Sequence, residues 1–260
     1  MFLKIVKYFI IFLIITNSSF AEDRIISLSP NITEILFKLD LGEYLVGVSK
    51  ECNYPNDAQK IDKVGSYNSI NIEKLASLKP TVVFGMKEGY MLEIKKKLDL
   101  LNIENHFFNS HNYKDVIFII KYLSEKYHKD SEGLINEINR VFSEKIIHDK
   151  SALFLLNLDP LIAAGSNSFI NDILKCGGFK NYIKASLIDY PKINIEKLYL
   201  NKPDYILISH NAKGSGIKLF KENLKRLKIN SKVVIINEDI FVRPSYRIIE
   251  ACYFLRKLKD

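Results

Sequence analysis

A short segment of this chain occurs twice, and the repetition restricts the fold more than any other feature. The segment INIEKL stands at residues 70–75 and again at 193–198, so the two copies are 123 positions apart. Each copy is followed, five residues later, by Pro80 or Pro203 and then by an apolar run. Two copies are too few for a solenoid. They predict two lobes of like architecture.

Within each half, short apolar runs alternate with amphipathic stretches, which is typical of strands followed by helices. Strands are expected at residues 24–28, 44–48, 81–85, 152–156, 205–208 and 233–236. Because most of these runs are continuous rather than alternating, they favour buried parallel strands covered by helices on both faces. Asn31 and Glu34 have capping-box spacing, which predicts a helix capped by Asn31. The predicted fold class is therefore α/β, with two Rossmann-like lobes of mainly parallel sheet.

Residues 130–150 lie between the two halves and contain no flexible linker. Apolar residues recur there at steps of three and four, which predicts one long amphipathic helix of about 19 residues, roughly 28 Å long. The expected organisation is an N-terminal lobe over 22–129, an inter-lobe helix over 130–150 and a C-terminal lobe over 151–260. A ligand cleft would then lie between the lobes. An ordinary crossover helix inside a single domain is the alternative.

The first 21 residues have the pattern of a secretory signal peptide. Lys4 and Lys7 precede or flank the start of an apolar run, and Ser19 and Ala21 supply small residues before a cleavage site. The run is shorter than the roughly 18 to 20 residues that a membrane span needs. No cysteine near the cut could take a lipid. We expect release into the periplasm without a lipid anchor; an uncleaved N-terminal anchor is the alternative.

Export would place the three cysteines in an oxidising compartment, where one pair and one free thiol are expected. Cys176 and Cys252 both belong to the C-terminal half, and we pair them. Such a bridge would stabilise the fold by roughly 4 kcal/mol in the chain-entropy model. Two unlinked core thiols remain the alternative. Cys52 has no neighbouring His or Cys in the sequence and is assigned no chemistry.

No motif of a common enzyme class is present. The chain lacks a nucleophile elbow, a phosphate-binding glycine loop, a dinucleotide fingerprint and close metal-ligand spacing. Its 38 basic and 30 acidic residues are dispersed, which gives little support for nucleic acid as a partner. We therefore expect a binding protein rather than an enzyme, with no catalytic residue, no metal ligand and no cofactor of its own.

In open α/β sheets, ligands lie beyond the carboxyl ends of the strands, and two facing lobes turn those ends into a cleft. Aromatic and thioether side chains there would contact a large planar ligand, and Lys87 and Arg243 could meet carboxylate, phosphate or amide oxygens. For each residue, loop packing is the alternative. The candidate ligand-binding residues are Ser29, Pro30, Asn31, Glu51, Tyr67, Met86, Lys87, Tyr90, Tyr190, His210, Phe241 and Arg243.

Several of these segments resemble a known family. Residues 24–34 (RIISLSPNITE), 46–49 (VGVS), 54–61 (YPNDAQKI) and 71–80 are similar, in this order, to the iron-siderophore/vitamin B12 periplasmic binding proteins of ABC importers. The resemblance covers residues 24–260. It implies two Rossmann-like lobes bridged by a backbone helix, with ligand held between them. Residues 47–65 look closest to the vitamin B12-binding branch.

The resemblance assigns roles to single residues. Tyr67, Tyr190 and Met86 stand where the vitamin B12 branch has tryptophan in the cleft, and Glu51 replaces an aromatic residue. This chain has no Trp at all. Cys176 matches a disulfide cysteine of that branch. Cys252 lies one helical turn before the expected partner, which keeps it on the same helix face.

Glu73 and Glu196, the acidic residues of the repeat, correspond to glutamates that dock onto the permease in this family. A favourable helix-dipole interaction is their structural alternative. The resemblance implies a monomeric carrier that delivers its cargo to an ABC permease dimer with ATPase subunits. The expected cargo is a corrinoid (cobalamin), with a ferric siderophore or haem as second choice. A periplasmic enzyme of chelatase type, or a metal-ion carrier using His106, His111, His148 or His210, ranks lower.

Overall fold

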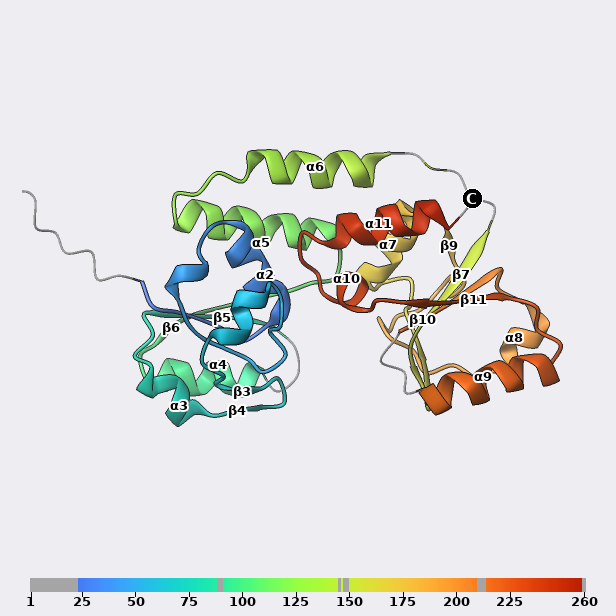
Figure 1. Ribbon diagram of the computed structural model, residues 1–260, viewed down its shortest axis with the longest axis horizontal. Coiled ribbons are helices and arrows are strands. Elements are labelled where there is room, and N and C mark those ends of the chain that lie inside the picture. Colours follow the sequence, from blue (N-terminus) through green and yellow to red (C-terminus); the bar gives the residue numbers. More distant parts are fainter. Residues whose placement is uncertain (1–22, 88–90, 145, 147–149, 210–213, 259–260) are drawn as a thin grey trace, which may run out of the picture.

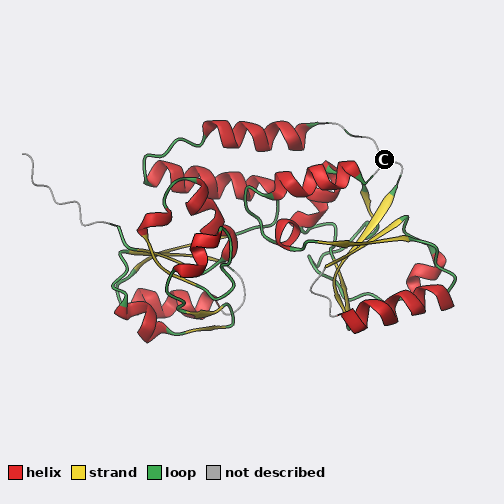
Figure 2. Cartoon of the chain, in the orientation of Figure 1, coloured by secondary structure: helices red, strands yellow, loops and turns green. Residues whose placement is uncertain are grey.

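The computed structural model describes residues 23–87, 91–144, 146, 150–209 and 214–258. Two α/β lobes lie next to each other, with helix α6 (Glu132–Ser143) on one side of the molecule (Figure 1). Helices cover both faces of the sheet in each lobe (Figure 2). The predicted signal peptide falls outside the described residues. Within the described ranges, no helix combines the length and the apolar character that crossing a membrane requires.

The N-terminal lobe is built on a four-stranded parallel sheet of order β2-β1-β5-β6. Its central strands are fully buried, as the continuous apolar runs predicted. The strands are β1 (Ile25–Ser27), β2 (Leu45–Val48), β5 (Val82–Met86) and β6 (Glu104–Phe108), with a small hairpin of β3 (Gly65–Ser66) and β4 (Ser69–Ile70). The helices are α2 (Pro30–Lys38), α3 (Ile72–Ser77), α4 (Met91–Leu100) and α5 (Tyr113–Lys126), with 3-10 turns η1 (Gly42–Tyr44) and η2 (Asn56–Lys60).

The C-terminal lobe contains a five-stranded sheet of order β11-β10-β7-β8, in which β9 also pairs with β7. All pairs are parallel except β7 with β8. The strands are β7 (Ser151–Leu158), β8 (Leu161–Ala163), β9 (Lys180–Asn181), β10 (Tyr205–Ser209) and β11 (Lys232–Ile236). The helices are α7 (Phe169–Cys176), α8 (Lys197–Leu200), α9 (Gly214–Arg226), α10 (Asp239–Val242) and α11 (Ile248–Lys257).

The duplication seen in the sequence is present in the topology. The path β2-β1-β5-β6 of the first lobe has its counterpart in β9-β7-β10-β11 of the second. In both lobes the repeated segment comes before the third strand of the sheet path, β5 or β10, and a helix, α3 or α8, begins within it. The hairpin β3–β4 and the antiparallel strand β8 are found in one lobe each. The two lobes therefore share one plan, as the 123-residue offset predicted.

The apolar core consists of one cluster that extends through both lobes and of two smaller clusters, one within each lobe. One cluster covers the faces of both sheets that lie towards α5, α6, α7 and α11, and it runs from Ile25 and Phe84 through Ile138 to Phe154 and Leu207. A second cluster lies under α3 and α4, and a third lies under α8 and α9. The lobes are thus joined by buried apolar surface as well as by the chain.

The helix between the lobes is shorter than predicted. It runs from Glu132 to Ser143, twelve residues, rather than over 130–150. Glu144 is already extended, and its carboxylate accepts hydrogen bonds from Arg140 and Arg256. The apolar periodicity continues to Ile146, but the backbone leaves the helical conformation at Glu144. Helix α6 nevertheless contacts α5 of one lobe and α7 and α11 of the other.

The predicted helix cap at Asn31 was wrong. Helix α2 begins two residues earlier than an Asn31 cap would place it, with Pro30 in its first turn and Ser29 as the N-cap residue. Proline suits this position because it has no N–H to leave unsatisfied. Glu34 does not reach back to the helix start; its side chain is buried and contacts the other lobe. The sequence spacing of a capping box is present, but the Glu34 carboxylate binds Arg243 of the other lobe instead of capping the helix.

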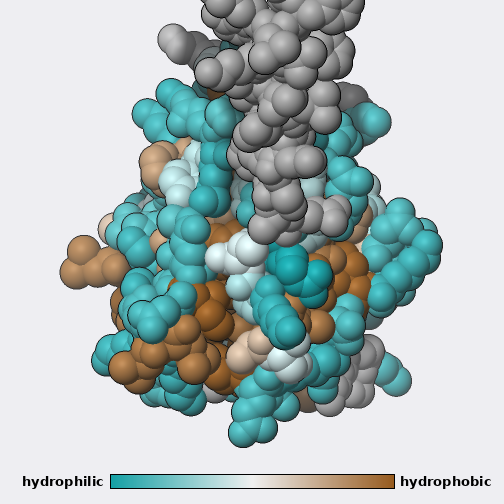
Figure 3. Space-filling view, turned by 90° about the vertical axis from the view of Figure 1, so that its left-hand side faces the viewer, coloured by the Kyte–Doolittle hydropathy of each residue, from teal (hydrophilic) through white to brown (hydrophobic). Residues whose placement is uncertain are grey.

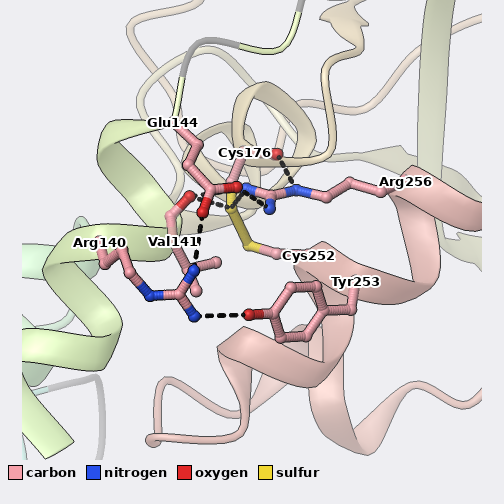
Figure 4. Close-up of a disulfide and its surroundings, with 7 residues drawn as sticks. All are labelled: Arg140, Val141, Glu144, Cys176, Cys252, Tyr253 and Arg256. Atoms are coloured by element: carbon pink, nitrogen blue, oxygen red, sulfur yellow. Dashed lines mark hydrogen bonds and ion pairs between the residues drawn. A yellow bond between two sulfur atoms is a disulfide. The ribbon is translucent and has the colours of Figure 1, made fainter.

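Cys176 and Cys252 are joined in a disulfide between α7 and α11, with their Cα atoms 5.5 Å apart (Figure 4). The guanidinium of Arg256 lies beside the sulfur atoms and donates to the carbonyl oxygens of Val141 (2.7 Å) and Cys176 (3.1 Å). These are carbonyls of the last turns of α6 and α7, where a cation is favourable. The bridge joins two helices of the C-terminal lobe, and Arg256 of α11 connects α6 to them through the Val141 carbonyl.

The third cysteine is sequestered. The Cys52 thiol is 1% exposed, accepts a hydrogen bond from the Thr33 hydroxyl (3.1 Å) and lies 3.2 Å from the Ser49 hydroxyl. Burial raises the pKa of this thiol, so little of the reactive thiolate forms. Alkylation of the folded protein, followed by peptide mass mapping, should therefore leave all three cysteines unmodified. After denaturation without reductant, Cys52 alone should react. Labelling of Cys176 or Cys252 at that stage would contradict the bridge.

Candidate ligand-binding cleft

A cavity of about 360 Å³ lies between the lobes and receives side chains from both. It is reached by the carboxyl ends of strands of both sheets, where α/β proteins bind ligands. Most lining residues follow β1, β2, β6 and β11 or lie at β5, β7, the β3–β4 hairpin, α7 and α10; Tyr190 lies between β9 and α8, and Arg243 and Pro244 follow α10. They are Ser29, Pro30, Asn31, Glu51, Tyr67, Met86, Ser110, Leu156, Phe169, Tyr190, Glu238, Asp239, Val242, Arg243 and Pro244.

A second and larger cavity, of about 730 Å³, adjoins the first. The two share four lining residues, Glu51, Glu238, Asp239 and Arg243. The larger cavity extends along the end of β11 to Asn53, and Ile235 in its wall is 42% exposed. Together they form one inter-lobe cleft with aromatic and apolar groups at one end and charged groups at the shared boundary.

Glu51 is held in place by neutral hydrogen-bond donors. Its carboxylate accepts from the Ser66 hydroxyl and from the backbone N–H of Tyr67 (3.0 Å). Partial burial by itself would raise the pKa of Glu51. The hydrogen bonds from Ser66, from the backbone and from Ser49 outweigh that effect and hold the pKa below its ordinary value. This side chain is consequently an anion at neutral pH.

Arg243 links the cleft to the N-terminal lobe. Its guanidinium donates to Glu34 (3.0 Å) and Asn53 (2.7 Å) across the lobe boundary, and pairs with Asp239 (2.9 Å) in its own lobe. Ser245 also donates to Glu34 (2.5 Å). Burial raises the pKa of Glu34, and the hydrogen bonds from Ser245 and Arg243 offset part of that rise. The charge of Arg243 is thus largely satisfied within the protein.

The start of α2 presents polar groups to the same cavity. The amide of Asn31 donates to the Met86 sulfur (3.3 Å) and to the carbonyl of Pro244 (3.4 Å), which fixes its orientation. The Ser29 hydroxyl is buried and makes no hydrogen bond to any residue in the described ranges. It can therefore donate to a carbonyl oxygen of a bound molecule.

Eight of the twelve residues predicted to contact ligand line the cleft: Ser29, Pro30, Asn31, Glu51, Tyr67, Met86, Tyr190 and Arg243. Lys87 is exposed at the end of β5 and is not among the lining residues. Tyr90 and His210 lie outside the described residues. Whether the eight bind ligand is a proposal that the geometry supports.

Phe241 was predicted wrongly. It is fully buried and packs against Phe154 (ring centroids 5.6 Å apart) and Phe254 (5.9 Å). Its neighbours on the same short helix, Asp239 and Val242, line the cleft instead. One turn of helix places residues on opposite faces, so the position of Phe241 close to other cleft residues in the sequence does not bring its side chain to the ligand.

Sequence reasoning left out several lining residues, among them Ser110, Phe169, Glu238 and Pro244. Ser110 and Glu238 come shortly after β6 and β11, so the rule of strand carboxyl ends could have found them. Phe169 is the first residue of α7 in the C-terminal lobe, and it follows the same three- and four-residue apolar spacing as the core residues Ile173 and Cys176 of that helix. Nothing in the sequence distinguishes it from the buried residues that follow.

Among the residues that the structure describes, no group of three or more His, Cys, Asp or Glu side chains could hold a metal ion. His106 contacts Glu104 (2.7 Å) and Tyr122 (2.9 Å) at the edge strand β6. His111 lies 3.4 Å from Asp189 of the other lobe. His148 and His210 fall outside the described residues.

Glu73 and Glu196 are both exposed, at the beginnings of the equivalent helices α3 and α8. Figure 1 places these helices on different lobes, both away from α6. In the view onto the end of the N-terminal lobe, hydrophobic side chains gather in the lower half (Figure 3). Exposed apolar residues of this lobe include Leu92 and Leu100 of α4.

Comparison with known proteins adds three findings. A family described as periplasmic binding protein matches residues 25–233. A vitamin B12-binding protein of Vibrio vulnificus is 27% identical over 238 residues, 88% of this chain and 87% of the relative. One of Salmonella typhimurium is 28% identical over 239 residues, covering 89% of this chain and 88% of the relative.

Solved structures show the same fold. The periplasmic vitamin B12-binding protein BtuF of Vibrio cholerae superimposes with a TM-score of 0.75 at 23% identity, over 90% of this chain and 95% of the other. The periplasmic haem-binding protein HutB of Vibrio cholerae gives a TM-score of 0.77 at 20% identity, over 92% and 99%. The predicted α/β class with two lobes is thereby confirmed.

Proposed function

This chain belongs to the periplasmic binding protein family, and from that premise we propose that it carries a corrinoid of the cobalamin type to an ABC importer. It would be a monomer that binds its cargo in the periplasm, after removal of residues 1–21, and it would catalyse no reaction. The observation that carries the proposal is the cleft, where Tyr67 and Tyr190 from opposite lobes line one cavity. Similarity to vitamin B12-binding relatives over 88% of the chain supports it.

The chemistry of the cleft suits a large ring with amide arms. Tyr67, Tyr190 and Phe169 offer flat apolar surface that loses little conformational entropy on binding. Ser29 offers a donor for a carbonyl oxygen, and Glu51 offers acceptor oxygens for amide N–H groups. A primary amide presents both a carbonyl and N–H groups, so the same arm can use both kinds of partner.

Titration calorimetry with cyanocobalamin tests the proposal. We expect saturable one-to-one binding at micromolar concentrations, with affinity reduced about ten-fold by Tyr67→Ala or Tyr190→Ala because each removes an aromatic contact. The matched control is Tyr199→Ala, which truncates a tyrosine that is 57% exposed and outside the cleft. Absence of cobalamin binding by the parent protein would refute the function.

Haem or a ferric siderophore is the second candidate. Tyrosine can serve as an axial ligand of haem iron, two tyrosines line the cleft, and haem-binding proteins share this fold. The same titration followed by absorbance separates the candidates, since an iron–tyrosinate bond would shift the haem spectrum.

The proposed partner is an ABC permease dimer with its ATPase subunits. Glu73 and Glu196 would dock onto it, one from each lobe. Their exposure and their equivalent positions in a duplicated fold support this role, because such a protein can present like carboxylates to a two-fold symmetric partner.

A further inference from the structure

We propose that the cleft selects its cargo by charge, accepting neutral or cationic corrinoids with amide arms and rejecting tetrapyrroles that carry carboxylates. This inference rests on the corrinoid function proposed above and adds a determinant of specificity to it. The determinants are the carboxylates at the boundary of the two cavities, above all Glu51 of the N-terminal lobe and Glu238 of the C-terminal lobe.

The described lining of the two cavities carries more negative than positive charge. Three of its side chains are carboxylates, those of Glu51, Glu238 and Asp239, and all three line both cavities. Arg243 is the basic residue in the same described lining. The two lobes both contribute carboxylates, so a molecule held between them lies close to anions on either side.

Arg243 neutralises its ion-pair partner Asp239 but is not available to an incoming anion. Its side chain is only 12% exposed, and its donors are directed at Glu34, Asp239 and Asn53. Glu34 is itself a fully buried carboxylate behind the cleft wall. To bind a ligand carboxylate, Arg243 would have to leave partners that burial makes costly to abandon.

Glu51 lines the cleft as an anion; Lys63 interacts with it electrostatically, while the Lys63 ammonium donates to the carbonyl oxygens of Cys52 (2.9 Å) and Ala58 (2.8 Å). The partners that hold Glu51 are hydroxyl and backbone N–H groups, which orient a carboxylate without neutralising it. Its lowered pKa shows that the anion is the favoured form. A partly enclosed cleft also focuses the field of such groups, because its walls have a lower dielectric constant than water.

A negatively charged cleft would distinguish haem from a corrinoid, two ligands that both contain a large tetrapyrrole ring. Haem carries two propionate carboxylates, which would enter a negative field. A corrinoid with primary amide arms donates N–H groups that carboxylates accept. One unit charge about 10 Å from another, at an effective dielectric constant of about 20, changes affinity by roughly ten-fold.

A matched pair of ligands tests the inference: cyanocobalamin, and the derivative in which one amide arm is hydrolysed to a carboxylic acid. For the parent protein we expect the monocarboxylate to bind about ten-fold more weakly than cyanocobalamin, with the ratio falling as salt is added. In Glu51→Gln, and further in the double variant with Glu238→Gln, the ratio should fall towards one and haem should bind more tightly. Glutamine keeps a carbonyl for the Tyr67 N–H, and the serine hydroxyls can accept from its amide.

Glu43→Gln is the control, since Glu43 is an exposed glutamate of the N-terminal lobe outside the cleft lining, and it should preserve the parent ratio. Equal binding of the two cobalamins by the parent protein, or a ratio unchanged in the double variant, overturns the charge inference and leaves the corrinoid function standing. Two results together overturn both the charge inference and the corrinoid function: the parent does not bind cyanocobalamin, and the double variant binds haem no more tightly than the parent does.

Discussion

Reversing the charge of Glu73 and Glu196 together, as Glu73→Arg with Glu196→Arg, is expected to abolish corrinoid uptake while ligand affinity persists. Both carboxylates are exposed at the start of equivalent helices, α3 and α8, and neither lines the cleft. Like charges at a docking surface repel the partner and slow its association. Each single reversal should weaken docking by about ten-fold or more, and the double reversal should reduce uptake to background.

Uptake of labelled cobalamin by cells, or by proteoliposomes that contain the cognate permease, measures the effect. Glu93→Arg with Glu222→Arg is the matched control, because these are exposed glutamates of α4 and α9, the next helix in each lobe. The control should transport normally. Docking through Glu73 and Glu196 is refuted if the double reversal transports as well as the control pair.

Replacing Glu34 by alanine is expected to lower the free energy of unfolding by about 3–5 kcal/mol, because it leaves charges buried without their partner. The Glu34 side chain is completely buried and lies within 3.6 Å of the guanidinium groups of both Arg243 and Arg247. Those arginines are 12% and 10% exposed, so water can replace the lost carboxylate only in part. Denaturant unfolding measures the change.

Two variants calibrate that result. Glu34→Gln keeps one acceptor oxygen for Arg243, and its NH2 group can donate to the Ser245 hydroxyl, but it removes the charge, so the loss of stability should be intermediate. Glu125→Ala removes the exposed partner of Lys121 on α5 and should leave stability unchanged within error. A Glu34→Ala protein as stable as the Glu125→Ala protein would show that this buried contact contributes nothing.

The parts of the fold that were predictable are those encoded by local repetition. The repeated segment and the continuous apolar runs were enough to place six strands and two lobes, because burial on both faces leaves its mark on consecutive residues. The carboxyl-end rule likewise located most of the cleft. The precise limits of the lobes at residues 129 and 151 stay a prediction.

What the sequence could not supply are contacts between distant residues. Glu34 looked like part of a helix cap, yet its partner Arg243 lies 209 residues away. Arg243 was expected to be available to a ligand, but that same contact occupies it. Phe241 failed for a related reason, since only the packing against Phe154 decides which side of a single helical turn faces the core.

The apolar cluster that runs through both lobes makes each lobe depend on the other to bury its hydrophobic surface. A chain cut in the loop between α6 and β7 would leave each fragment with a hydrophobic face uncovered, because Ile138 and Val141 of α6 belong to the same buried cluster as Phe154 and Cys252 of the other lobe. The present halves have become interdependent, so neither is a portable module.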